Sequence, residues 1–276
     1  MSDNAQQIEY WNGPAGQRWA AMQEQTDRNL AAISSALMNF AAAKPGERVL
    51  DIGCGAGTTT QVLADAVGLT GKVTGVDISE PMLSVARART RASNVEYIRA
   101  DASAYDFRPG YTLAFSRFGV MFFADPAAAF TNIRGALDAG GRLAFVCWRA
   151  MQENAWAAAP FAAAHDLLPK QEPMDPHAPG PFAFADQKRL MGILVKAGFS
   201  EFRGDKLDTV MNMGANLDEA VVASLSIGPL ARAAADVDEA TRGKIAARVR
   251  ETLAKFKSAS GSITPPGACW LVSAQV

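Results

Sequence analysis

One stretch decides the fold class: residues 48–60, which read Arg-Val-Leu-Asp-Ile-Gly-Cys-Gly-Ala-Gly-Thr-Thr-Thr. Its first five residues are mostly apolar, which is typical of a strand that is buried on both faces of a sheet. Glycines then stand at Gly53, Gly55 and Gly57, and a helix is expected to follow. Glycine tolerates positive φ and lets a ligand lie against bare backbone. The stretch therefore predicts a ligand-binding turn at the carboxyl end of the first strand of an α/β sheet, where helix amides favour a carboxylate.

The spacing of the glycines separates two kinds of ligand. A dinucleotide-binding turn follows Gly-x-Gly-x-x-Gly and would need glycine at position 58, where Thr58 stands. Asp51, two residues before the first glycine, would repel a pyrophosphate, but its carboxylate suits the ammonium of a cofactor that carries an amino acid. S-adenosylmethionine (SAM) has such an ammonium, together with a carboxylate and a sulfonium. We therefore expect SAM, and we keep a nucleotide-dependent oxidoreductase as the alternative.

Two further carboxylates follow predicted strands. Asp77 ends the run 73–77, 20 residues after Gly57, where a carboxylate can accept both ribose hydroxyls. Asp101 follows the next run and is placed to accept a hydrogen bond from an adenine amino group. The glycine turn and its three strand-end carboxylates form one consistent set.

The remaining pattern alternates apolar runs with stretches long enough for helices. Strands are expected at residues 48–52, 72–78, 95–99, 112–116, 142–148, 202–211 and 268–274. Helices are expected at residues 15–43, 81–92, 126–139, 155–166, 186–197, 217–234 and 238–256. Pro81 and Pro126 would lie in first helical turns behind the caps Ser79 and Asp125. The alternation predicts an α/β fold with a doubly wound, mostly parallel sheet.

Three segments resemble motifs one to three of the class I SAM-dependent methyltransferases. They are Val-Leu-Asp-Ile-Gly-Cys-Gly-Ala-Gly, Val-Thr-Gly-Val-Asp and Arg-Ala-Asp-Ala, and the resemblance covers roughly residues 45–276. It implies a seven-stranded Rossmann-like sheet whose last strand, at 270–274, runs antiparallel. Residues 114–123 hold the fourth-motif position and are similar to the branch of ubiquinone/menaquinone C-methyltransferases and other small-molecule enzymes. They depart from the Asp/Asn-Pro-Pro-aromatic motif of DNA amino-methylating enzymes.

The resemblance also implies which residues contact the cofactor and its product, S-adenosylhomocysteine (SAH). Asp51 and the glycine turn would hold the methionine part, Asp77 the ribose, and Asp101 with Ala102 the adenine. The full predicted set is Asp51, Gly53, Cys54, Gly55, Gly57, Asp77, Ile78, Asp101, Ala102, Ser116 and Trp19.

Candidates for the acceptor side are fewer, and each has a structural alternative. Tyr10, Trp11 and Trp19 either anchor the first helix or form a lid whose aromatic faces lie near the sulfonium. Arg117 either binds an anionic acceptor or forms a structural ion pair, and Phe118 beside it could line the acceptor pocket.

Three more residues have two interpretations each. Phe182 is either pocket wall or core of the cap. His165 is the candidate general base, with an ordinary surface histidine as the alternative. Cys54 is interpreted as a small buried filler and not as a nucleophile.

The amino-acid composition limits the kinds of binding partner that we expect. Lys and Arg number 27 against 28 Asp and Glu, a net charge of −1, so the attraction to phosphate that drives nucleic-acid binding has no evident source. Cys54, Cys147 and Cys269 are far apart and favour a reducing compartment. No signal peptide, membrane span or metal-ligand spacing is evident, which predicts a cytoplasmic protein that binds a small-molecule acceptor. The sequence is silent on the acceptor and on the oligomeric state.

The length exceeds what a methyltransferase core needs. The chain has 276 residues, whereas such a core needs about 150–200, within the usual size of a domain. We therefore expect a single domain, residues 1–276, with a helical cap from about 1–43, 149–185 and 215–262. A non-catalytic SAM-binding protein with the same architecture is a second alternative.

Overall fold

A seven-stranded sheet forms the centre of the protein. The computed structural model describes residues 4–170 and 175–276, so residues 1–3 and 171–174 of the predicted cap lie outside it. The strands are β1 (Arg48–Ile52), β2 (Lys72–Asp77), β3 (Val95–Arg99), β4 (Tyr111–Arg117), β5 (Leu137–Trp148), β6 (Ser200–Val210) and β7 (Pro266–Gln275). Their order is β3-β2-β1-β4-β5-β7-β6, and β7 runs antiparallel to both neighbours while the other pairs are parallel. The predicted fold class is confirmed.

The order of the strands reverses between β1 and β4, which sets the position of the site. Helices α4 (Thr58–Val67) and α5 (Glu80–Arg89) make the crossovers from β1 to β2 and from β2 to β3, whereas α6 (Pro126–Ala136) makes the crossover from β4 to β5. Right-handed crossovers that run in opposite directions place their helices on opposite faces of the sheet. The crevice between the carboxyl ends of β1 and β4 is therefore the expected ligand site.

The core lies between this sheet and its helices. Strands β1 and β4 bury most of their side chains, and β5 buries those from Leu143 to Trp148, as their continuous apolar runs predict. Helix α3 (Gln23–Ala41) packs against β4 to β7 through Ile33 and Leu37, and α8 (Gln187–Lys196) packs against β6 and α6. Ser79 and Asp125 accept hydrogen bonds from the first turns of α5 and α6, as predicted.

The predicted helix at 15–43 is wrong in one respect, because the amino-terminal segment forms three helices. They are α1 (Ala5–Asn12), α2 (Pro14–Ala21) and α3, separated at Gly13 and Met22. At the first corner, α1 and α2 meet so closely that a Cβ on Gly16 would lie 1.9 Å from the Trp11 carbonyl oxygen. The Ser79 hydroxyl donates to that same oxygen at 2.7 Å, which ties the corner to α5. This contact fixes the corner between α1 and α2, which precedes the predicted helix, whereas the break inside that helix falls at Met22.

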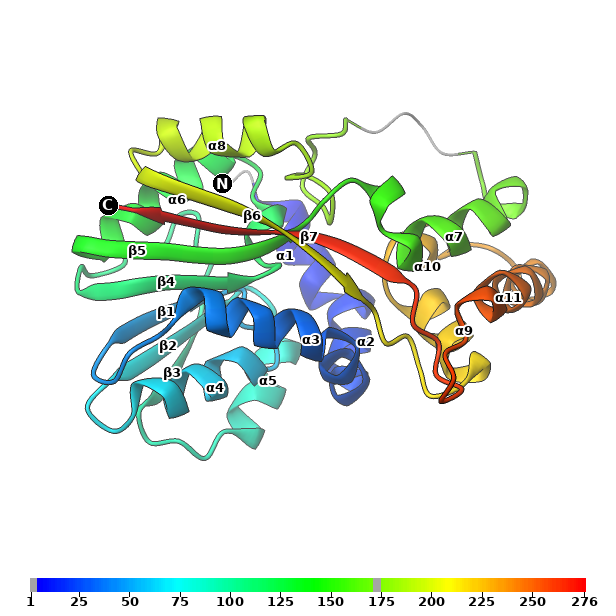
Figure 1. Ribbon diagram of the computed structural model, residues 1–276, viewed down its shortest axis with the longest axis horizontal. Helices are drawn as coiled ribbons and strands as arrows, with labels where there is room; N and C mark the ends of the chain where they lie inside the picture. Colours follow the sequence, from blue (N-terminus) through cyan, green and yellow to red (C-terminus); the bar gives the residue numbers. More distant parts are fainter. Residues whose placement is uncertain (1–3, 171–174) are drawn as a thin grey trace.

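A second group of helices lies beyond the carboxyl ends of the parallel strands (Figure 1). It contains α7 (Ala155–Ala164), α9 (Leu217–Ser226), α10 (Pro229–Ala233) and α11 (Glu239–Leu253). The single helix predicted at 217–234 is also wrong: Gly228 has φ +96° and Pro229 begins a new helix. Short 3-10 helices are η1 (Val120–Phe122), η2 (Met151–Glu153), η3 (His165–Leu167) and η4 (Ala254–Phe256).

None of the helices in the described ranges has the length and apolar character needed to cross a membrane.

Candidate functional site

The glycine turn after β1 forms the floor of the site. Gly53, Gly55 and Gly57 have φ of +66°, +55° and +80°, a conformation that side chains disfavour. A Cβ on Gly53 would lie only 2.7 Å from the Cα of Gly119, just past the end of β4. The two strand ends that flank the switch point therefore touch through glycine backbone, which leaves the space above them open.

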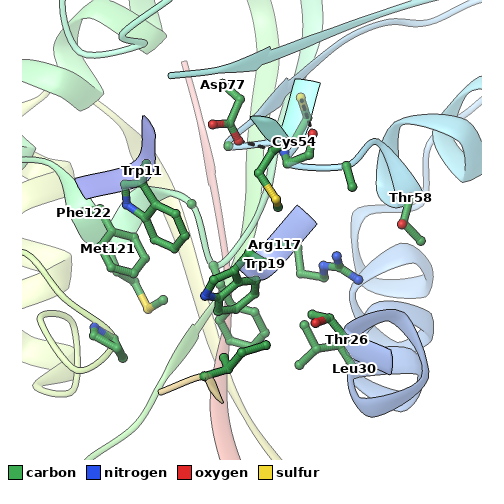
Figure 2. A pocket seen from close by; sticks show the side chains of 18 of the residues that line it. Trp11, Trp19, Thr26, Leu30, Cys54, Thr58, Asp77, Arg117, Met121 and Phe122 are labelled. Carbon is green, nitrogen blue, oxygen red and sulfur yellow. Dashed lines mark hydrogen bonds between the residues drawn. The ribbon is translucent and has the colours of Figure 1, made fainter. Parts of the chain in front are cut away.

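Asp77 stands at the end of β2, beside the turn. Its Oδ2 accepts from the Gly55 amide at 2.8 Å, and its Oδ1 accepts from the Ser79 amide at 2.8 Å. Burial raises the pKa of Asp77 above its ordinary value, and backbone hydrogen bonds oppose that rise. The carboxylate is thus fixed in orientation at the edge of the cavity (Figure 2).

Asp101 follows β3, and only one of its two carboxylate oxygens is hydrogen-bonded. Its Oδ1 accepts from the amide and hydroxyl of Ser103, at 2.9 and 2.7 Å, and from Asn4 at 3.3 Å. Its Oδ2 is buried and has no hydrogen-bond partner. A buried acceptor without a partner is costly, so this oxygen suits a ligand that brings a donor.

Asp51 lies beneath the glycine turn and not on the cavity wall. It is fully buried, and its Oδ2 accepts from the hydroxyls of Thr59 and Thr60 at 2.8 and 2.6 Å. Its Oδ1 has no partner. Burial raises the pKa of Asp51 from 3.8 to about 6, although the two threonine hydrogen bonds and Arg117 oppose the rise. The negative charge therefore lies just below the floor of the site.

A single cavity runs from these strand ends into the space under the helical cap. Eleven of the predicted site residues line it: Trp11, Trp19, Gly53, Cys54, Gly55, Asp77, Ile78, Asp101, Ala102, Arg117 and Phe118. Six others do not: Tyr10, Asp51, Gly57, Ser116, His165 and Phe182.

Most of those six have evident structural surroundings. Tyr10 lies at the surface under the Arg232 guanidinium, and Phe182 packs against the core. Ser116 is buried, where it donates to the Ile52 carbonyl and accepts from the Gly119 amide. His165 is exposed in η3, so it has no position from which to act on a ligand in this cavity.

Aromatic side chains form the walls away from the carboxylates. The Trp11 ring meets Phe122 and Trp19 edge to face, with centroids 5.4 and 5.7 Å apart (Figure 2). Phe118 stacks on Trp148 with ring centroids 4.3 Å apart and planes 11° apart. Phe118 also has φ +66°, which is unusual for a residue with a side chain. Backbone strain of this kind concentrates at functional sites, where surrounding packing maintains it.

Several lining residues were missed by sequence reasoning. Thr26, Asp27 and Leu30 come from α3, whereas the far wall comes from Trp148, Trp156, Met211, Met213 and Ile227. One signal could have indicated Thr26: it lies four residues before Leu30, on the apolar stripe of the helix, where a polar side chain is out of place.

Asp27 ties this helix to the glycine turn. The Thr58 hydroxyl donates to Asp27 Oδ1 and Oδ2 at 2.7 and 2.8 Å, and Gln23 also donates to Oδ2. Arg89 of α5 pairs with the same carboxylate at 3.2 Å. This network fixes α3 beside the start of α4.

In the parts of the chain that the structure describes, no group of three or more His, Cys, Asp and Glu side chains could hold a metal ion.

Comparison with known proteins agrees with the fold. Residues 49–141 match the family model described as a methyltransferase domain. The chain is similar to the ubiquinone/menaquinone biosynthesis C-methyltransferase UbiE of Shewanella sediminis, 28% identical over 174 residues, which is 58% of this chain and 69% of that protein. It is also similar to the aklanonic acid methyltransferase DauC of Streptomyces sp. (strain C5), 36% identical over 104 residues. That match covers 36% of this chain and 47% of DauC, so the chain spans only part of the curated relatives that it matches.

A solved structure shows the same fold. Phosphoethanolamine N-methyltransferase 2 of Haemonchus contortus, in complex with SAM, aligns with a TM-score of 0.52 and 20% identity, over 88% of this chain and 52% of that one. The sheet order, the glycine turn and the strand-end acids define a class I methyltransferase fold. The matching family model identifies residues 49–141 as a methyltransferase domain, and the similarity to UbiE extends over 58% of the chain.

Proposed function

We propose that the protein transfers the methyl group of SAM to a small, partly apolar acceptor by in-line displacement. One observation carries the proposal: a single cavity joins the carboxylates at the strand ends to an aromatic chamber under the helical cap. Cofactor and acceptor would meet where the glycine turn and the end of β4 come together.

The residues at the strand ends fit the cofactor. The unpaired Oδ2 of Asp101 would accept from the adenine amino group, and the fixed carboxylate of Asp77 would accept from the ribose hydroxyls. The Gly53–Gly55 backbone leaves room for the methionine part, and the buried charge of Asp51 beneath it favours an ammonium above. When bound, SAM supplies a methyl group that its sulfonium makes electrophilic.

The aromatic chamber would orient the acceptor and exclude water. Trp11, Trp19 and Phe122 form one group of contacting rings that line it, and Phe118 with Trp148 forms another. Orientation and desolvation are the main contributions that a protein can make to such a displacement. No histidine is among the described residues that line the cavity, and Asp27 already accepts several hydrogen bonds. We therefore assign no side chain as general base.

Three further observations favour a small-molecule acceptor. UbiE and DauC, to which the chain is similar, are named for ubiquinone/menaquinone biosynthesis and for aklanonic acid. The net charge of −1 favours no polyanionic partner. All three cysteines are free and buried, which supports our proposal of a cytoplasmic location.

A transfer assay tests the function. The protein is incubated with methyl-labelled SAM and acceptors of four classes: phenols, carboxylic acids, amines and thiols, each with an apolar body. We expect labelled product from at least one class, lost in Asp77→Ala and retained in Asp65→Ala, a matched change on the exposed face of α4. SAH binding without transfer to any acceptor would favour the non-catalytic alternative. Binding of NAD(H) in place of SAH would favour the oxidoreductase.

A further inference from the structure

Arg117 is a buried cation whose hydrogen-bonding capacity is mostly unused. It ends β4 and lines the cavity, and its side chain is only 14% exposed. A guanidinium carries five N–H donors. Within the described part of the chain, Arg117 donates one hydrogen bond, from Nη1 to the Ser34 hydroxyl at 2.8 Å. The remaining donors are therefore available to a ligand.

Asp27 does not accept hydrogen bonds from the remaining N–H donors of Arg117. Its Oδ1 lies 3.9 Å from Arg117 Nη2, which is too long for a hydrogen bond. Its oxygens are instead occupied by Thr58, Gln23 and Arg89. A purely structural ion pair would be expected to bring the guanidinium and the carboxylate into direct contact.

Thr26 adds a second unused donor in the same region. Its side chain is 8% exposed, it lines the cavity, and its hydroxyl has no hydrogen-bond partner. Figure 2 shows Thr26 on α3 and Arg117 on β4 on the same side of the cavity, with Leu30 and Trp19 beside them. A buried hydroxyl without a hydrogen-bond partner is unfavourable unless a ligand supplies that partner.

We propose that Arg117 and Thr26 form an oxyanion site, which binds a carboxylate or another ionised oxygen of a ligand in this cavity. Apolar neighbours strengthen such a contact, because an ion pair is less screened away from water. The site rests on the proposed function, since that function supplies two sources for the oxyanion. One is the amino-acid carboxylate of the cofactor, and the other is an acidic oxygen of the acceptor.

The first arm of the test concerns the cofactor. Calorimetry compares SAH with 5′-methylthioadenosine, which lacks the amino-acid end, for the wild type, Arg117→Met and Thr26→Val. If the cofactor supplies the carboxylate, SAH affinity should fall about 10- to 100-fold in Arg117→Met and less in Thr26→Val, with 5′-methylthioadenosine affinity unchanged. Arg89→Met is the matched control, because it removes a cation from Asp27 without changing the cavity wall.

The second arm concerns the acceptor. Fluorescence titration in saturating SAH compares 1-naphthoate with 1-naphthylmethanol, which has the same rings but no charge. If the acceptor supplies the oxyanion, the wild type should prefer naphthoate at least about tenfold, and both variants should lose that preference. Either result supports the oxyanion site and identifies its source.

Two further measurements distinguish loss of the oxyanion site from loss of folding and from failure of the proposed function. Thermal unfolding of each variant shows whether it is folded, and Arg117→Lys provides a charge-retaining variant if Arg117→Met is not. Thr26→Val should melt no lower than the wild type, because it removes an unpaired buried hydroxyl. If neither preference changes in folded variants, or if naphthoate does not bind and SAH binding is unaffected, the oxyanion site is refuted. Failure of the wild type to bind SAH refutes the proposed function instead, and the naphthoate titration repeated without SAH still tests the site.

Discussion

Replacing Asp51 by asparagine should stabilise the ligand-free protein at neutral pH. The carboxylate is fully buried beneath the glycine turn, and one of its oxygens has no partner. The Thr59 and Thr60 hydroxyls that donate to the other oxygen could donate equally well to an asparagine carbonyl. The substitution therefore removes a buried charge and keeps its hydrogen bonds.

The size of the expected difference in the free energy of unfolding follows from the pKa of Asp51. Burial raises the pKa of Asp51 from 3.8 in its ordinary state to about 6 in the folded protein. A carboxyl with a raised folded pKa holds its proton more tightly when folded, so its stabilising contribution is present at low pH and is lost as pH rises from 4 to 6. At about 1.4 kcal/mol per pH unit, ionised Asp51 lowers the free energy of unfolding at pH 7 by about 3 kcal/mol.

Urea denaturation of the two ligand-free proteins measures this effect. Asp51→Asn should be more stable than the wild type by up to about 3 kcal/mol at pH 7 and nearly equal to it at pH 4. The difference between the proteins isolates Asp51, because every other titrating group is common to both. SAH should nevertheless bind Asp51→Asn more weakly, since the charge beneath its ammonium is gone.

Two results would rule out a destabilising charge on Asp51. One is a stability difference that does not change between pH 4 and pH 7. The other is a clear destabilisation by Asp51→Asn at pH 7, which would mean that the ionised carboxylate contributes favourably in the ligand-free fold.

Two further substitutions test the surroundings of the site. Gly53→Ala should lower the free energy of unfolding by at least about 2 kcal/mol, because its Cβ would lie 2.7 Å from Gly119 at positive φ. Gly68→Ala has a similar φ of +64° but open space, and should cost only about 1 kcal/mol in the same urea titration; equal effects would contradict the close approach. Hydrogen bonds and charge from Arg142 lower the pKa of Glu47 despite burial, so Glu47→Gln should cost about 1 kcal/mol at pH 7. That loss should shrink as pH falls below 4.5, and a constant loss from pH 7 to pH 3 would show that the ion pair is not its cause.

The sequence was sufficient to predict the part of the site that lies at the ends of the parallel strands. Gly53, Asp77 and Asp101 lie at or just after the ends of β1, β2 and β3, and parallel strands bring their carboxyl ends to one edge. Asp51 was expected to hold the methionine part of the cofactor together with the glycine turn, but one of its oxygens accepts hydrogen bonds from Thr59 and Thr60, and the residue does not line the cavity.

The far wall of the cavity was not predictable in the same way. Thr26 and Met213 are nearly 190 residues apart in the chain, and only tertiary packing, in which α3 contacts β6, brings them to one cavity. The corner at Met22 contains neither glycine nor proline, so no local signal marked it. Gly228-Pro229, in contrast, carried a turn signal that the helical pattern of its neighbours outweighed.

Calorimetric titration with SAH is the direct test of cofactor binding at the carboxyl ends of the strands. The wild type should bind SAH at a single site, and Asp77→Ala should bind it at least about tenfold more weakly, because it would lose the charge-assisted hydrogen bonds that we propose between this carboxylate and the ribose. Absence of binding by the wild type, or undiminished binding by a folded Asp77→Ala, would contradict the account.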